Sequence, residues 1–262
     1  MILMVWLDWA NPEKFDTPKV MQVLERYSAY RATFPGTLQI ALNHIDYTTK
    51  PYALPYWRRG DPILCRTPPY DHSLLAPFPP IDIFPYEFVW GSPSFECDDI
   101  AHHAGFIGSR SGFGGYRERV ASETSKVGIG YCVTDRLSYG EYAAMMSKCR
   151  IIVCPQGWGG GSLRHWDAWK SNKPVLTDRN CSLLEMIPGE TLQERVHYLV
   201  YDDPSEIPDI VSDWTKLSRR ADLEAIAARG RAAALSYDAC AQMNTFFDNL
   251  GIGAGSLEKS QT

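Results

Sequence analysis

Apolar and polar positions follow a regular rhythm over the second half of the chain. Short apolar runs of strand length occur at 103–108 (HAGFIG), 128–132, 150–154, 174–177 and 198–201. Between them, helical spacing is found at 116–126, 138–147, 162–171 and 204–214, and alanine-rich helices are expected at 219–235 and 237–250. Strands that alternate with helices predict βαβ units and a parallel, Rossmann-like sheet.

The first hundred residues have a different pattern. The apolar run at 1–7 and the segment 37–42 are expected to be strands, with a helix at 18–33 between them. Ten of the 18 prolines then fall between Pro51 and Pro93. Because proline fixes φ and lacks a backbone donor, this stretch is expected to be extended and loop-rich, without long helices or central strands.

Composition narrows the class of protein. The 262 residues are 45% apolar and 22% charged, as in ordinary soluble domains, and the net charge of −5 gives no general affinity for polyanions. The opening apolar run is interrupted by Asp8, and no run approaches the roughly 18 residues of a membrane span, so neither a signal peptide nor a span is expected. Seven cysteines without a CxxC pair predict reduced, mostly buried thiols and a cytoplasmic protein.

A first candidate motif is GFIGSRSGFGGYRERV, residues 105–120. A strand that ends in a glycine-rich turn and opens a helix presents free backbone N–H groups to a phosphate. Arg110 and Arg117 can add bidentate contacts, with Gly108 and Ser109 in the turn. The spacing matches neither GxGxxG nor the P-loop pattern. An ordinary βα turn with arginines on a solvated helix face is an equal alternative.

The block 138–178 carries more information. A buried strand delivers the chain to a glycine-rich loop that leads into a helix capped by Ser162, and ligands of parallel sheets lie at such carboxyl ends. Arg164 in the first helical turn can reach a diphosphate, and Asp167 can accept the hydroxyls of a ribose. The loop and its borders comprise Pro155, Gly157, Trp158, Gly159, Gly160 and Gly161. Alternatively, Ser162 only caps, Arg164 pairs with Asp167, and the tryptophans belong to the core.

At these residues the chain resembles the donor-sugar half of GT-B glycosyltransferases, and most closely the exostosin-like family, whose pattern includes S-K-(apolar)-C-P-x-G, S-x-R-x-x-E-A and P-V. The matching residues are Tyr142, Ser147, Lys148, Cys154, Pro155, Gly157, Ser162, Arg164, Asp167, Ala168, Pro174 and Val175. The resemblance implies two lobes, with the nucleotide-sugar bound by the second. It places Arg164 at the diphosphate and Asp167 at the ribose. Asp167 stands where the family usually has glutamate.

Glycosyl transfer also needs a group that takes the acceptor's proton. Asp8 follows the first expected strand, and His44 and Asp46 follow the second, so all three are candidates for a base at strand ends, with Asp8 ranked first. Helix N-terminal amides and arginines can neutralise a departing nucleoside diphosphate. No metal and no cofactor are therefore expected.

The sequence thus predicts an α/β, GT-B-like protein with an acceptor lobe at 1–100, a donor lobe at 101–235 and a C-terminal helix and tail at 236–262 packing back on the first lobe. The expected activity is metal-independent, inverting transfer from a nucleotide-sugar to a hydroxyl of a glycan or similar acceptor. Transfer to a modified base in DNA is the second hypothesis, although the net charge does not favour DNA. A non-catalytic nucleotide- or sugar-binding module is the third.

Overall fold

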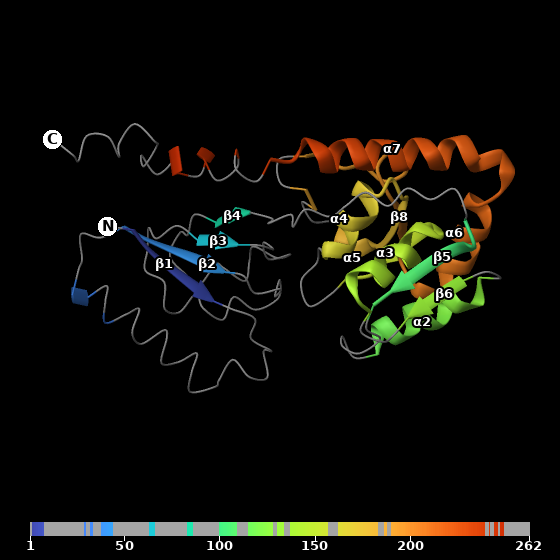
Figure 1. Ribbon diagram of the computed structural model, residues 1–262, viewed down its shortest axis with the longest axis horizontal. Helices are drawn as coiled ribbons and strands as arrows, with labels where there is room; N and C mark the ends of the chain where they lie inside the picture. Colours follow the sequence, from blue (N-terminus) through green and yellow to red (C-terminus); the bar gives the residue numbers. More distant parts are fainter. Residues whose placement is uncertain are drawn as a thin grey trace. The chain divides into compact units, whose positions relative to one another are not determined.

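The structure is a computed structural model. It describes residues 100–108, 115–127, 130–133, 137–156, 162–182, 186–187 and 190–238, the backbone of four short strands before residue 90, and the single positions or pairs 29, 32–33, 241, 244–245 and 247–248. The chain divides into two compact units, Met1–Phe88 with Asp238–Thr262, and Val89–Tyr237 (Figure 1). The assignment of acceptor and donor roles to two lobes stays a prediction.

The first unit contains a four-stranded parallel sheet in the order β1-β2-β3-β4. Its strands are β1 (Ile2–Leu7), β2 (Leu38–Asn43), β3 (Ile63–Cys65) and β4 (Ile83–Pro85). The two expected strands are confirmed, and Met4 lies opposite Ile40 in the β1–β2 register. The expected helix at 18–33 lies almost wholly outside the described residues.

One expectation for the proline-rich stretch was wrong. The short strand β3 has a hydrogen-bonded neighbour on each side, so it is an interior strand. Its three residues contain no proline and lie between Pro62 and Pro68, which leaves just enough backbone donors for pairing. Pro85 ends β4 at the edge of the sheet, where a missing N–H group costs little.

The second unit contains a five-stranded sheet in the order β6-β5-β7-β8-β9, and every neighbouring pair is parallel. Its strands are β5 (His102–Ile107), β6 (Gly130–Val133), β7 (Cys149–Cys154), β8 (Val175–Asp178) and β9 (Leu199–Tyr201). All five expected strands are present within one or two residues of their predicted bounds. The predicted α/β class with a parallel sheet is therefore confirmed.

Helices connect these strands as the apolar spacing predicted. They are α2 (Tyr116–Lys126), α3 (Tyr139–Ser147), α4 (Leu163–Lys170), α6 (Ile207–Trp214) and α7 (Arg220–Ser236), with short turns at α5 (Arg179–Ser182), η4 (Pro204–Glu206) and η5 (Leu217–Arg219). Ser138 starts α3 with a capping box, in which its backbone N–H donates to Glu141 Oε2 at 2.8 Å. The expected helix at 237–250 falls largely outside the described residues.

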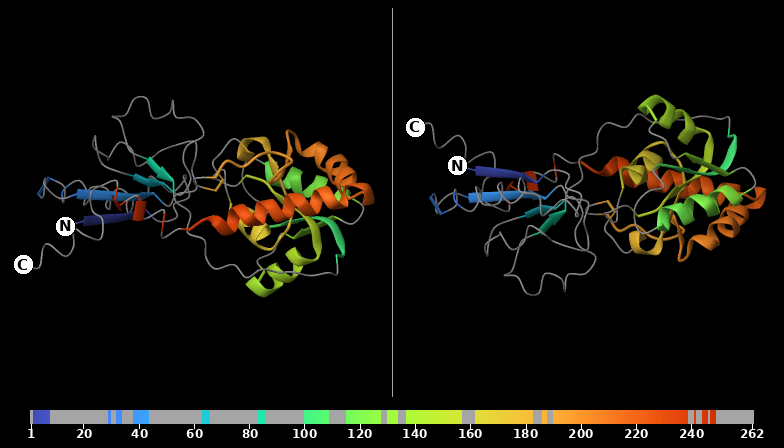
Figure 2. Two further views of the ribbon diagram at one scale, coloured as in Figure 1. Left: turned by 90° about the horizontal axis from the view of Figure 1, so that it is seen from above. Right: turned by 90° about the horizontal axis from the view of Figure 1, so that it is seen from below.

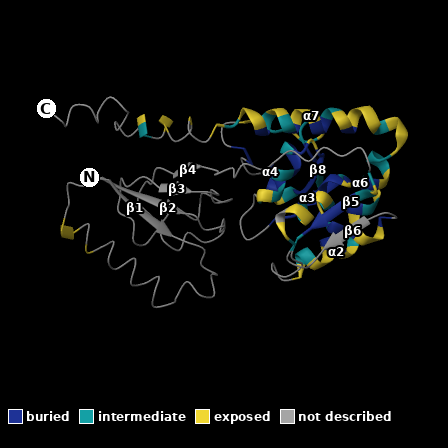
Figure 3. Ribbon diagram, viewed as in Figure 1, coloured by how far each residue is buried: buried dark blue, intermediate teal, exposed yellow. Residues whose placement is uncertain are grey.

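Both faces of this sheet are covered. Helices α2 and α6 lie on one face, in a cluster with Phe106, Ile151 and Leu176. Helix α4 lies on the other, where Trp166 and Trp169 pack with Ile152, and α7, the long orange helix in Figure 2, packs against α4. In Figure 3 the buried residues gather along the strands and the exposed ones on the outer sides of the helices. Neighbouring strand residues therefore point to opposite faces, as the pleat requires.

The cysteines that can be examined behave as core residues. Cys149, Cys154 and Cys181 are buried free thiols. Burial raises the pKa of Cys149 and of Cys154 to about 12, so both are protonated at neutral pH. These three fit the expectation of reduced, buried thiols.

Candidate active site

The carboxyl ends of β5, β7 and β8 meet at one edge of the second unit's sheet, because these strands are parallel neighbours. Gly108 follows β5, Pro155 and Gln156 follow β7, and Arg179 follows β8. Helix α4 begins at Leu163, shortly after β7, and its first turn therefore also belongs to this edge. Ligands of open α/β sheets bind at such an edge, so the candidate site is built here.

Two arginines from different helices converge beside Gly108. Arg164 of α4 donates from Nε to the carbonyl oxygen of Ile107 at 2.8 Å, and its guanidinium carbon lies 5.0 Å from the Phe106 ring centroid. The guanidinium carbon of Arg117, from the first turn of α2, lies 5.5 Å from the same centroid. A Cβ at Gly108 would meet Nη2 of Arg164 and come within 3.4 Å of Nη2 of Arg117. Glycine is thus required here to admit both guanidinium groups.

These two arginines are poorly neutralised. Neither forms an ion pair with any residue in the described part of the chain, where Nε of Arg117 and Nη1 of Arg164 are also buried without a hydrogen-bond partner. Burial, followed by the positive charge of Arg164, lowers the pKa of Arg117 to about 10. Arg117 is still cationic at neutral pH. Two adjacent charges with unused donors form a natural binding site for an anion.

Asp167 lies one turn further along α4 and is half-buried. It does not pair with Arg164, which was one of the alternatives considered above. Its Oδ2 instead accepts a hydrogen bond from the Tyr142 hydroxyl of α3 at 3.0 Å. Burial and the nearby Asp167 carboxylate raise the pKa of Tyr142, which remains a neutral donor. The tyrosine therefore orients a carboxylate that lies one helical turn after Arg164 on α4.

Ser162 and His165 form the start of α4. The backbone N–H of Ser162 donates to His165 Nδ1 at 3.2 Å, so His165 Nε2 carries the proton and donates to Thr177 Oγ1 at 2.9 Å. The Thr177 hydroxyl in turn donates to the Cys154 carbonyl at 2.8 Å. Burial lowers the pKa of His165 to about 3. His165 is thus a neutral core residue that fixes α4 to β7 and β8.

Asp178 was part of the block examined above but received no role there. This buried carboxylate accepts hydrogen bonds from the backbone N–H groups of Gln156 and Cys181. It therefore ties the chain just before the glycine-rich loop to the start of α5. Burial raises its pKa. The only sequence signal was an acidic residue at the end of an apolar strand.

The sequence-derived site residues can now be sorted. The structure brings Gly108, Arg117 and Arg164 together, with Asp167 on the same helix as Arg164 and Pro155 and Ser162 near the same sheet edge. The others lie outside the described residues; these are Asp8, His44, Asp46, Ser109, Arg110, Gly157, Trp158, Gly159, Gly160 and Gly161. Within the described ranges, no group of three or more histidine, cysteine or acidic residues could hold a metal ion. The absence of a metal requirement stays a prediction.

Comparison with protein families decides the assignment of this unit. A family model described as glycosyl transferase-like matches residues 99–247, more than half of the chain. The chain belongs to this family. No curated protein sequence matches this glycosyltransferase.

Solved structures support the same fold. Sucrose-phosphate synthase from Thermosynechococcus elongatus superposes with a TM-score of 0.60 at 12% identity, covering 92% of this chain and 80% of that one. HepE from Anabaena, crystallised in complex with UDP and glucose, gives a TM-score of 0.62 at 11% identity, covering 88% and 75%. The predicted GT-B-like fold is thereby confirmed. The exostosin-like assignment stays a prediction, as does the cytoplasmic location. Among the described residues no helix is long and apolar enough to cross a bilayer.

Proposed function

We propose that this glycosyltransferase transfers a sugar from a nucleoside diphosphate sugar, and that Arg164 and Arg117 hold the diphosphate beside Gly108. The observation that carries this proposal is the pair of half-buried guanidinium groups that has no carboxylate partner in the described residues and retains buried, unused donors. Holding two like charges together costs free energy, and a diphosphate would relieve that cost by accepting bidentate hydrogen bonds.

The same arrangement suits the chemistry of the leaving group. When the acceptor oxygen bonds to the anomeric carbon, the bond from that carbon to the β-phosphate oxygen breaks and negative charge grows on the diphosphate. Two fixed guanidinium groups stabilise this charge more strongly in the transition state than in the bound donor. They supply the positive charge that a divalent ion supplies in metal-dependent transfer. We therefore propose metal-independent transfer.

We assign Asp167 to the ribose hydroxyls of the donor, with Tyr142 keeping its carboxylate in place. The glycine-rich loop 157–161 and Ser162 are proposed to surround the phosphates and the sugar. Asp8 is the proposed base that takes the proton of the acceptor hydroxyl, with Asp46 and His44 as alternatives. A single displacement with such a base inverts the anomeric configuration. The acceptor is proposed to be a hydroxyl of a glycan or of a similar molecule.

A panel of nucleotide-sugars tests the proposal by thermal shift, because a ligand that binds only the folded state raises the midpoint of unfolding. The nucleotide-sugar with the largest shift is then incubated with the protein, and release of the nucleoside diphosphate is followed with and without EDTA. We expect binding, turnover and no loss with EDTA. Binding without turnover across many acceptors would instead favour the non-catalytic module, and a steep salt dependence with DNA acceptors would favour the DNA enzyme.

A further inference from the structure

Phe106 in β5 contacts both arginines of the candidate site. Its side chain is fully buried, and the guanidinium carbons of Arg164 and Arg117 lie over its ring at 5.0 and 5.5 Å from the centroid. A guanidinium group within about 6 Å of an aromatic face is attracted by the negative potential of that face, and more strongly where water is excluded. One aromatic ring therefore attracts two cations.

The ring matters most for Arg117. Arg164 is also held by its hydrogen bond to the Ile107 carbonyl, whereas Arg117 has neither a hydrogen bond nor an ion pair among the described residues. The Nη2 atoms of both arginines approach the position that a Cβ would occupy at Gly108, so the two like charges are neighbours and repel each other. Within the described part of the chain, the Phe106 ring is the contact that opposes this repulsion.

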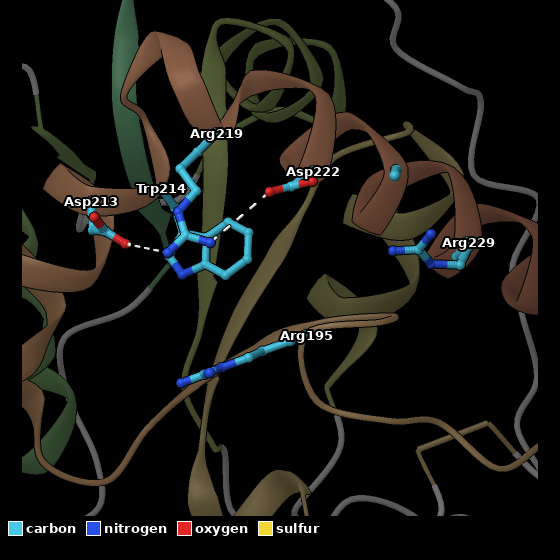
Figure 4. A pocket seen from close by; sticks show the side chains of 7 residues that line it. Arg195, Asp213, Trp214, Arg219, Asp222 and Arg229 are labelled. Carbon is cyan, nitrogen blue, oxygen red and sulfur yellow. Dashed lines mark ion pairs between the residues drawn. The ribbon is translucent and has the colours of Figure 1, made fainter.

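Another arginine over an aromatic ring in the same unit is neutralised differently. Arg219 stacks on the Trp214 ring at 4.9 Å, beside a hollow of about 390 Å³ (Figure 4). The carboxylates of Asp213 and Asp222 pair with this guanidinium at 3.4 and 3.9 Å. The ring of Phe106 thus differs from that of Trp214, because it lies under two cations that have no carboxylate partner among the described residues.

From this geometry we propose that Phe106 is a positioning residue of the donor site, whose ring holds Arg117 and Arg164 together beside Gly108 before the donor binds. The inference rests on the proposed function, in which the two arginines bind the diphosphate. A diphosphate that meets two guanidinium groups already in place loses less free energy in ordering them, so it binds more tightly. Because the ring is buried, it acts through the arginines.

Replacing Phe106 with mono-, di- and trifluorinated phenylalanine tests this role. Fluorine withdraws electron density from the ring face, while the ring keeps its shape and nearly its volume. Calorimetry with inorganic pyrophosphate, the diphosphate part of the donor, measures the effect. We expect the Kd to rise with each added fluorine and to be about tenfold higher with three. A ring that only fills the core would give no such series.

Phe106→Leu complements the series, because leucine is apolar but has no ring face, and it should bind pyrophosphate at least as weakly as the trifluorinated protein. The fluorinated proteins keep the test decisive if Phe106→Leu fails to fold. The matched control is Trp214→Leu, which also removes a ring from under an arginine. Arg150 near the start of β7 donates to the Thr215 carbonyl at 3.5 Å, which places this end of α6 at the opposite edge of the sheet. Trp214→Leu should therefore leave the affinity unchanged.

Arginine variants separate this inference from the proposed function. Arg117→Ala and Arg164→Ala should each bind pyrophosphate at least about tenfold more weakly than the wild type. In Arg117→Ala the effect of the fluorines should shrink, since one cation remains over the ring. Weak binding by the arginine variants together with wild-type affinity, or tighter binding, in the trifluorinated protein would overturn the role of Phe106 alone. Wild-type affinity in both arginine variants would overturn the diphosphate assignment and this inference with it.

Discussion

Two arginines on one helix show how differently the molecule uses the same side chain. Arg119 of α2 is exposed and donates from Nη2 to both carboxylate oxygens of Asp203, with both hydrogen bonds near 3 Å. Arg117, two residues earlier, turns toward Gly108 and Arg164, where burial lowers its pKa and no carboxylate among the described residues balances its charge. Exposed ion pairs contribute little to stability. A half-buried, unbalanced pair is costly to folding, and binding an anion offsets that cost.

The largest expected effect comes from removing one arginine of the half-buried pair, Arg117 and Arg164. Arg164→Ala should lower kcat/KM by at least about 100-fold, because a fixed donor to the developing charge is lost. Its stability should change by no more than about 1 kcal/mol, since the lost bond to Ile107 is offset by removal of a poorly solvated charge. Steady-state kinetics and urea unfolding measure the two quantities.

Arg119→Ala is the matched control for this comparison. It removes an equal charge from the exposed surface of α2, and we expect less than a twofold change in kcat/KM. If both variants retained turnover, the buried pair would have no role in transfer. If Arg164→Ala failed to fold, the arginine would be needed for the fold. The proposal that the half-buried arginines serve binding and the exposed ones do not would then be wrong.

Only those features of the site that depend on local sequence patterns could be predicted from the sequence. Strand and helix bounds in the second unit follow from apolar spacing and from local caps such as Ser138, so they could be predicted closely. The grouping of Gly108, Arg117 and Arg164 followed from strand ends that must share one edge of a parallel sheet.

Contacts between distant segments could not be derived in this way. Tyr142 and Asp167 are 25 residues apart, and Asp178 reaches Gln156 across 22 residues, so no spacing rule pairs them. Strand β3 was missed because three apolar residues become a strand only when neighbours on both sides pair with them. Long-range packing, rather than propensity, decides these features.

A second prediction concerns His165, the buried residue that fixes the start of α4 to β7 and β8. His165 has a pKa near 3 in the folded state because it is buried, against 6.5 in the unfolded chain. The unfolded state therefore binds a proton that the folded state rejects, and stability falls as the pH drops below 6.5. We expect a loss of about 2 kcal/mol between pH 7 and pH 5, measured by urea unfolding.

His165→Asn isolates this contribution, because the variant should lose most of the slope between pH 7 and pH 5 even if it is less stable throughout. His197, whose pKa is also lowered by burial, adds a smaller slope of the same sign to both proteins. Asp178 acts in the opposite direction, because burial raises its pKa, and it too is common to both. Equal slopes in the two proteins would show that His165 is not buried as a neutral side chain.

The smallest effects are expected from alanine substitutions at two glycines. One substitution should weaken binding of the nucleotide-sugar, and the other should lower the stability of the fold. At Gly108 an added methyl group would meet the end of the flexible Arg164 side chain, which can move away. Gly108→Ala should therefore unfold normally but bind the nucleotide-sugar about tenfold more weakly, since the guanidinium group is displaced. At Gly230 the methyl group would come within 2.7 Å of Trp169 Nε1 and 2.9 Å of the His197 carbonyl oxygen.

Neither obstacle at Gly230 can move easily, because one is a buried ring and the other is backbone. Overpacking costs about 1–3 kcal/mol, and the higher helix propensity of alanine returns about 1 kcal/mol of this. Gly230→Ala should accordingly be less stable in urea by about 1 kcal/mol, while the folded protein binds the nucleotide-sugar with unchanged affinity. Affinity lost in Gly230→Ala, or stability lost in Gly108→Ala, would mean that the arginine pair and the α4–α7 packing are not independent.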